Sequence, residues 1–134
     1  MELELVASVL SDPNRGVALA ARETITCGLF DCDDVRLIFA AALVACDRGK
    51  LAVLRLSRMA LRREGWWDAN ARAFERNGRW SDTSLANLAC AHPCPAMTIT
   101  LARELLDLCK RMARVVACWR EMKAAMVIDE SCVT

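Results

Sequence analysis

Residues 101–126 read LARELLDLCKRMARVVACWREMKAAM, and the regular spacing of their apolar side chains decides the fold. The apolar positions are separated alternately by four and by three residues, and they are Leu101, Leu105, Leu108, Met112, Val115, Trp119, Met122 and Met126. Alternating steps of three and four keep one stripe of a helix facing a partner, as in a coiled coil. The sequence therefore predicts a long amphipathic helix over residues 96–127, followed by a tail over 128–134.

This stripe, which we call the heptad seam, has two candidate partners. If the seam faces another copy of the chain, it forms a homo-oligomer, of which a dimer is the simplest case. The side chains predicted to mediate that contact are Leu101, Leu105, Leu108, Met112, Val115, Trp119 and Met122. The alternative is that the whole stripe lies against the chain's own core, because helices of globular proteins also have broad apolar faces.

The residues upstream of the seam also have helical patterns, bounded by glycine and proline. The predicted helices cover residues 2–11, 14–26, 33–48, 53–64 and 81–90, and a further short helix falls between 66 and 80. In the helix over 53–64, the inward positions are predicted to be Leu54, Leu56, Met59, Ala60 and Leu61. Together these segments predict an all-α fold, a compact bundle of five or six helices ending in the long one. We expect a single domain over 1–134, with its globular part in 1–95.

Composition narrows the class of protein. Of the 134 residues, 55% are hydrophobic, and only 3 prolines and 5 glycines interrupt them, which favours a helical core over disorder. We find no export signal and no apolar run of membrane-spanning length, so we expect a cytoplasmic protein. The 8 cysteines are scattered through predicted helices, and we expect them to be reduced and to serve as small apolar core residues.

Positive charge gathers in residues 55–80, although the net charge of the chain is only +1. Arginines recur there at helical spacing, beside Trp66, Trp67 and Trp80. The arginines that we single out as candidate nucleic-acid contacts are Arg55, Arg58, Arg62 and Arg63. Arginines grip phosphates and aromatic rings stack on bases, so a small DNA-binding regulator is the alternative function. The opposing interpretation is a solvated helix face with the tryptophans packed against the core.

One cluster has the composition of a metal site. Cys90, His92 and Cys94 place three soft ligands within five residues, and Cys27 or Cys32 is a candidate fourth. Cys-x-His-x-Cys is not a common zinc motif, however, and no second cysteine pair supports it, so we expect no bound metal or other cofactor. The single histidine and the absence of a paired-carboxylate motif also argue against an enzyme.

Several blocks resemble the helical N-terminal domain of DnaB-type replicative helicases, from about Glu2 to about Arg114. In that family a short apolar helix is closed by Asp-Pro, as at Asp12-Pro13, and a later helix carries Arg-x-Ile-Phe, as at Arg36-Leu37-Ile38-Phe39. The run Arg62-Arg63-Glu64-Gly65 is similar to the Arg-Arg-x-Gly that ends another helix of the family.

The resemblance implies a non-catalytic module. In these helicases the domain forms the collar of the ring and docks primase or loader proteins. We therefore expect protein–protein interaction and oligomerisation in DNA replication, with a second copy, a replicative helicase, a primase or a helicase loader as partner. A phage or mobile-element accessory protein and a piece of a larger helicase are the two alternatives for its context. The phosphate-binding loop Gly-x-x-x-x-Gly-Lys-Ser/Thr of the helicase motor does not occur in the sequence.

Overall fold

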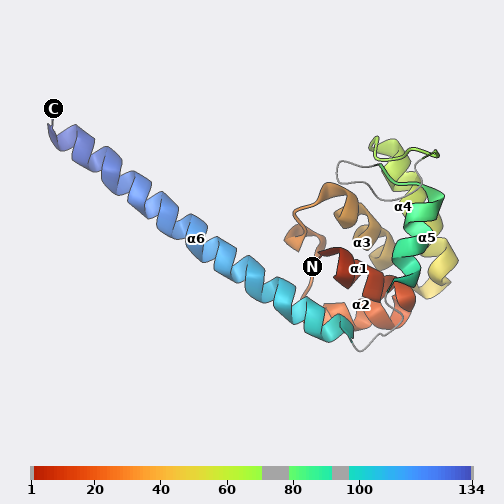
Figure 1. The fold of residues 1–134 in the computed structure, drawn as a ribbon. Helices are drawn as coiled ribbons and strands as arrows, with labels where there is room; N and C mark the ends of the chain where they lie inside the picture. The colour runs from red at the N-terminus through yellow and green to blue at the C-terminus, as the bar shows by residue number, and fades with distance from the viewer. Residues whose placement is uncertain (1, 71–78, 92–96, 134) are drawn as a thin grey trace.

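The computed structural model describes residues 2–70, 79–91 and 97–133, with side chains as far as Met126 (Figure 1). Its helices are α1 (Glu2–Ser11), α2 (Pro13–Arg22), α3 (Asp33–Ala45), α4 (Lys50–Arg63), α5 (Asp82–Cys90) and α6 (Met97–Val133), with short 3-10 turns η1 (Cys27–Leu29) and η2 (Cys46–Arg48). These ranges contain no β-strand, so the predicted all-α bundle ending in one long helix is confirmed.

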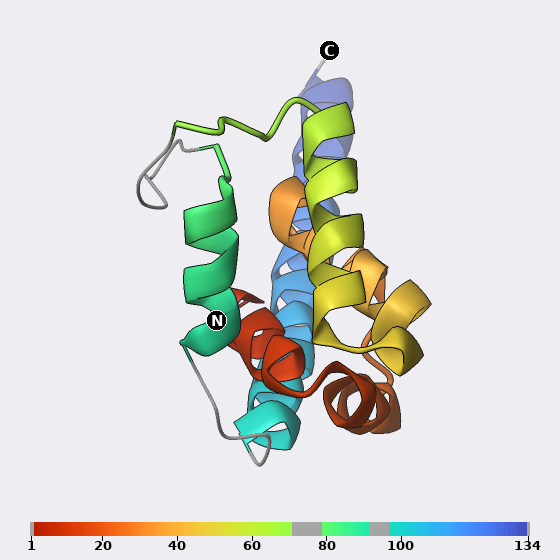
Figure 2. The same cartoon turned by 90° about the vertical axis from the view of Figure 1, so that its right-hand side faces the viewer.

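The helix α1 is the centre of the bundle. Every residue from Leu5 to Leu10 is buried, so α1 has no solvated face over that stretch. It packs against all five other α-helices, and Figures 1 and 2 show it enclosed between them. A helix that is apolar on all sides is stable only in the interior of a domain, which explains why α1 lies at the centre of the bundle.

Several helix bounds differ from prediction: α3 ends at Ala45 rather than at residue 48, where η2 follows, and α4 begins at Lys50 rather than at residue 53. α2 ends at Arg22 rather than at residue 26, because Thr24 adopts a left-handed φ of 61°. The N–H of Ile25 then donates to Ala20 O at 3.2 Å and the N–H of Thr24 to Ala21 O at 2.9 Å, a Schellman motif closed by the buried Ile25. Gly65, with φ 80°, ends α4 by the same motif, as the sequence predicted.

The buried face of α4 also differs from prediction. Val53, Ser57 and Leu61 are the buried residues, one on each successive turn, whereas Met59 is exposed. Ser57 was overlooked as a core position because it is polar. Its hydroxyl donates to Val53 O at 2.8 Å, which satisfies the buried group within the helix itself.

The described parts of the 66–80 segment are extended rather than helical. Trp67 and Trp80 form an isolated β-bridge, in which Asp68 N donates to Trp80 O at 2.8 Å and Trp80 N donates to Trp66 O at 2.6 Å. The short helix predicted here does not include 66–70 or 79–80, and residues 71–78, on which the rest of that prediction falls, lie outside the described ranges. The backbone pairing brings Trp80 back to the body just before α5 begins at the capping box of Ser81 and Ser84.

The long helix α6 leaves the body in one direction (Figure 1). Its 37 residues correspond to roughly 55 Å at 1.5 Å per residue. The helix continues through Val133, past the predicted end at residue 127, because no glycine or proline follows Met126 in the sequence. None of the helices in the described ranges is both long and apolar enough to cross a membrane.

Candidate protein interaction surface

The first third of α6 belongs to the body. Thr98, Leu101, Ala102 and Leu105 are buried there, against α1, α2 and η1. The hydroxyls of Ser8 and Thr98, both fully buried, share a hydrogen bond that joins the middle of α1 to the start of α6. These contacts fix the direction in which the rest of the helix projects.

Two polar contacts at the margin of the body add to this attachment. Arg103 Nε donates to Glu23 Oε1 at 3.2 Å, which links α6 to the end of α2. The Cys109 thiol lies 3.5 Å from Leu29 O and donates to that carbonyl of η1. Cys109 is the last residue of α6 that packs against the core, so the attachment ends there.

Beyond Cys109 the helix has no intrachain cover. Every residue from Lys110 to Met126 is exposed. Five apolar side chains of the heptad seam point into solvent here, and Leu108, just before Cys109, does so too. We call these six the exposed seam: Leu108 (41% exposed), Met112 (48%), Val115 (67%), Trp119 (63%), Met122 (64%) and Met126 (62%). Large apolar side chains in one contiguous stripe are typical of an interaction site.

The structure thus divides the predicted interface. Leu101 and Leu105 lie in the intrachain core, so placing them at a partner interface was wrong. The remaining predicted residues, from Leu108 to Met122, are exposed and available to a partner. Met126 adds one more turn to that set. The intrachain alternative therefore holds for Leu101 and Leu105, and the partner interface from Leu108 onward stays a prediction.

Charged side chains flank the exposed seam without covering it. Lys123 Nζ lies 5.4 Å from the centroid of the Trp119 ring, a cation–π contact one turn along the helix. Arg111 pairs with Asp107 at 2.9 Å on the outer side. Val116, 47% exposed, widens the apolar stripe on one flank. A partner would therefore meet an apolar centre with a polar rim, the usual anatomy of a protein interface.

The arginines of α4 form a second candidate surface. Arg55, Arg58, Arg62 and Arg63 are all exposed, and Arg58 Nη1 lies 3.6 Å from Asp82 Oδ1 of α5. α4 and α5 run side by side in Figure 2, and the groove between them has a volume of about 340 Å³. It is lined by Leu51, Leu54, Arg55, Arg58, Asp82, Leu85 and Ala86.

The tryptophans do not join these arginines as a stacking platform. Trp80 is 1% exposed, and its indole Nε1 donates to Asp34 Oδ2 at 2.8 Å. Trp66 and Trp67 are half-buried and pack against the core. Base stacking needs free aromatic faces, so this geometry favours the core role of the tryptophans and leaves only the arginines for contacts to phosphate.

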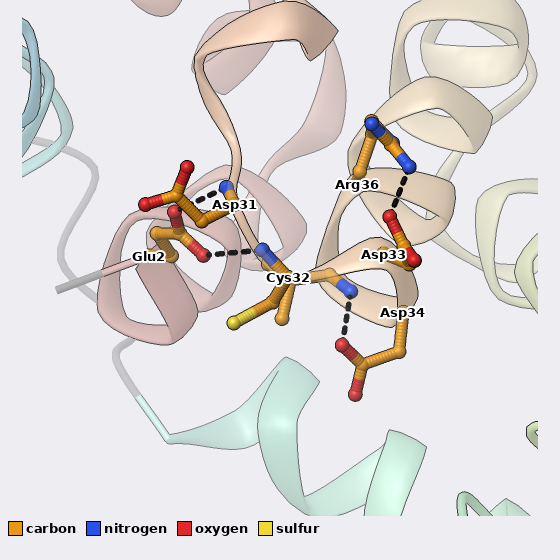
Figure 3. Close-up of polar contacts among 7 residues, drawn as sticks. Glu2, Asp31, Cys32, Asp33, Asp34 and Arg36 are labelled. Carbon is orange, nitrogen blue, oxygen red and sulfur yellow. Dashed lines mark hydrogen bonds and ion pairs between the residues drawn. The ribbon is translucent and has the colours of Figure 1, made fainter. Parts of the chain in front are cut away.

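A carboxylate cluster at the start of α3 has a structural role (Figure 3). The Glu2 carboxylate accepts from the backbone N–H of Asp31 at 2.8 Å and from that of Cys32 at 3.3 Å. Asp33 pairs with Arg36, and Asp34 Oδ1 accepts from Val35 N at 2.9 Å. Acidic side chains are favourable at a helix N-terminus, where backbone N–H groups are unpaired, so the cluster fastens α1 to α3.

The cysteines are less buried than predicted. Of the six cysteines whose side chains are described, none is disulfide-bonded and none is fully buried. Cys27 and Cys109 pack at the edge of the core, so the predicted core role is wrong for the exposed cysteines. Cys27, Cys46 and Cys109 are half-buried, and Cys32, Cys90 and Cys118 are exposed. His92 and Cys94 of the candidate metal cluster lie outside the described residues. Within the described residues no group of three ligating side chains comes together.

The same carboxylate cluster changes the acidity of two thiols. Burial raises the pKa of the Cys32 thiol, and the neighbouring Glu2, Asp34 and Asp31 raise it further. Burial also raises the pKa of the Cys109 thiol, followed by the charges of Asp31 and Glu2. A raised pKa lowers the thiolate fraction at a given pH, and the thiolate is the nucleophile.

We expect Glu2→Gln to speed alkylation of Cys32 and Cys109 at pH 8 by about threefold, because removing this charge lowers the pKa of both thiols and raises their thiolate fraction. Rates with iodoacetamide between pH 7 and 9.5, followed site by site by mass spectrometry, measure this. Glu4→Gln, an exposed neighbour on the same helix, is the control. Equal rates for the two variants would show that the Glu2 charge does not act on these thiols.

Comparisons of the chain with protein-family models, with curated proteins and with solved structures gave no match.

Proposed function

We propose that this chain is a non-catalytic protein–protein interaction and oligomerisation module in DNA replication, similar to the helicase collar that docks primase or a loader. The exposed seam from Leu108 to Met126 is the observation that carries the proposal. The role in replication rests on the resemblance of Asp12-Pro13 and Arg36-Leu37-Ile38-Phe39 to that family, and a cytoplasmic location is proposed from the sequence alone.

Covering the exposed seam with a second helix is favourable in free energy. A helix without tertiary contacts is only marginally stable in water, yet α6 continues for 24 residues after Cys109. Burying six large side chains on each of two helices removes on the order of 1,000 Å² from water, the size of a small specific interface. At about 25 cal/mol per Å² the gross gain exceeds the roughly 4–15 kcal/mol that association costs.

The first test is the oligomeric state. We expect the purified chain to form a homo-oligomer and Val115→Asp to weaken it by at least about 100-fold, since a carboxylate would lose its water inside an apolar seam. Val115 is exposed in the single chain, so the body keeps its helical circular dichroism. Sedimentation velocity over a range of concentrations measures the shift.

Ala117→Asp is the matched control, because it adds the same charge on the opposite face of α6. It should leave association within about threefold of the unmodified chain, as exposed charges have small effects. A chain that stays monomeric at hundreds of micromolar would refute self-association. The replication role is tested separately, by titrating purified helicase, primase and loader against the chain in biolayer interferometry.

DNA binding through α4 remains the alternative function, supported by the exposure of its four arginines. Fluorescence anisotropy with single- and double-stranded DNA, repeated at rising salt, distinguishes it. Tight, salt-sensitive binding that is lost in an Arg55→Gln, Arg62→Gln double variant would favour this alternative over the interaction module, because phosphate contacts release counterions.

A further inference from the structure

We propose that the exposed seam pairs with the same seam of a second copy in antiparallel orientation, with Val115 of each helix level with Trp119 of the other. This inference rests on the self-association proposed above and adds its geometry. It is carried by the register that the six exposed residues allow, by their sizes and by the side chains that flank them.

The register uses every exposed seam residue. In heptad terms Met112, Trp119 and Met126 occupy one core position, and Leu108, Val115 and Met122 occupy the other. Antiparallel helices pair the first kind with the second. One alignment sets Leu108 against the partner's Met126, Met112 against the partner's Met122, and Val115 against the partner's Trp119. No seam residue from 108 to 126 is left without an apolar counterpart in this alignment.

Side-chain size favours this alignment over a parallel one. Trp119 is the largest residue of the exposed seam, and Val115 is the smallest. The antiparallel alignment places one indole opposite one isopropyl group in each of the two central layers. A parallel alignment would force both Trp119 rings into a single layer, and overpacking of that kind typically costs about 1–3 kcal/mol.

The flanking positions agree with the same geometry. The two-fold axis crosses the helix pair at the level of Ala117, which itself lies on the opposite face of α6. Val116 therefore lies next to the partner's Val116 on one side of the seam, and Cys118 lies next to the partner's Cys118 on the other side. The cations Arg111 and Lys123 then lie opposite the partner's Ala125 and Cys109, so no like charges face each other. In a parallel pair Val116 would instead meet the partner's Arg111, and the apolar flank would be lost.

The two bodies lie at opposite ends of this arrangement. The body covers the heptad seam at Leu101 and Leu105, so the paired part of the seam begins at Leu108, and the last helical residues of the partner, 127–133, have to pass outside the body there. In the antiparallel pair the two Leu108 residues lie roughly 27 Å apart along the axis, at 1.5 Å per residue. The bodies therefore sit at opposite ends of the helix pair, whereas a parallel pair would bring both to the same end.

A charge exchange between Met112 and Met122 tests the orientation. Met112→Lys and Met122→Glu should each weaken the dimer by about tenfold or more, because each buries a charge against a methionine. The double variant should dimerise at least about tenfold more tightly than either single variant, since the introduced lysine of each helix then faces the introduced glutamate of the other. Sedimentation equilibrium gives the three dissociation constants. Ala117→Lys with Ala124→Glu carries the same charges on the outer face and should match the unmodified chain.

The outcomes separate the two proposals. A parallel pair would place lysine against lysine and glutamate against glutamate, so a double variant weaker than both single variants would overturn the antiparallel geometry while self-association stands. A trimer or tetramer in the unmodified chain would also overturn it. A monomer at all concentrations, including one that binds anionic lipid vesicles through α6, would remove the self-association on which it rests.

Discussion

Trp80→Ala is expected to destabilise the body by about 5 kcal/mol, the largest effect of any substitution considered for this chain. Trp80 is the largest fully buried side chain among the described residues, so its removal leaves a cavity in the core. It also removes the indole N–H that donates to Oδ2 of Asp34, a buried carboxylate whose Oδ1 still accepts from Val35 N. Small domains have only about 5–15 kcal/mol of net stability, so the variant should be largely or partly unfolded at 37 °C.

Three variants, Trp80→Phe, Asp34→Ala and the two combined, separate packing from hydrogen bonding at this site. Trp80→Phe keeps most of the buried ring and loses the donor, so it should cost about 2–3 kcal/mol. Adding Asp34→Ala to Trp80→Phe should cost less than the sum of the two single changes, because the stranded acceptor is removed as well. Urea denaturation followed by circular dichroism gives all three values. Full additivity would show that the indole–carboxylate hydrogen bond contributes nothing to folding.

Trp80 also illustrates what the sequence could not reveal. Beside the arginines of 55–80, three tryptophans suggested a surface that stacks on bases. The deciding partner, Asp34, is 46 residues away in the sequence, and no local pattern connects the two. A sequence that places tryptophans near arginines looks the same whether the rings face solvent or the core. Only the fold shows that these rings pack against the core.

Helix positions were more predictable than helix ends and faces. The spacing of apolar residues located the six α-helices. Gly65 correctly marked the end of α4, and Ser81 correctly marked the start of α5. The end of α2 was missed because a threonine, Thr24, takes the left-handed conformation that favours glycine. Threonine rarely adopts this conformation, so the residue type gave no sign of the helix end.

The heptad seam shows the same limit at the candidate interface. Its spacing predicted one continuous stripe, and the stripe is continuous. Spacing does not tell which part of a stripe the chain covers itself, and here the boundary falls between Leu105 and Leu108. That boundary depends on where α1 and η1 pack against α6, which is a property of the tertiary fold.

Gly16→Ala is the second change with a large expected effect. A Cβ built at Gly16 would lie 2.6 Å from Val9 Cα and 2.8 Å from Val9 O, both backbone atoms of α1. A flexible side chain could move aside, but the backbone of the central helix cannot do so without disturbing its packing. We expect a loss of about 3 kcal/mol in the free energy of unfolding, which thermal and urea denaturation measure.

Gly28→Ala is the matched control for this contact. A Cβ there would meet only Thr26 Oγ1, at 3.8 Å, an ordinary contact distance. Alanine also reduces the conformational freedom of the unfolded chain, so this change should be neutral or stabilising by up to about 1 kcal/mol. Similar losses at both positions would mean that the two substitutions act through helix or turn propensity and that α1 and α2 do not require the close approach at Gly16.

The effect of Gly16→Ala should extend to the base of α6. α6 packs against both α1 and α2, so moving the two helices apart displaces the surface that holds Leu101 and Leu105. The exposed seam lies beyond that attachment, so the proposed self-association should persist wherever the body stays folded. Sedimentation velocity on the same samples would then still detect an oligomer, while denaturation shows a less stable body. The two measurements together distinguish a loss of stability in the body from a loss of the proposed helix pair.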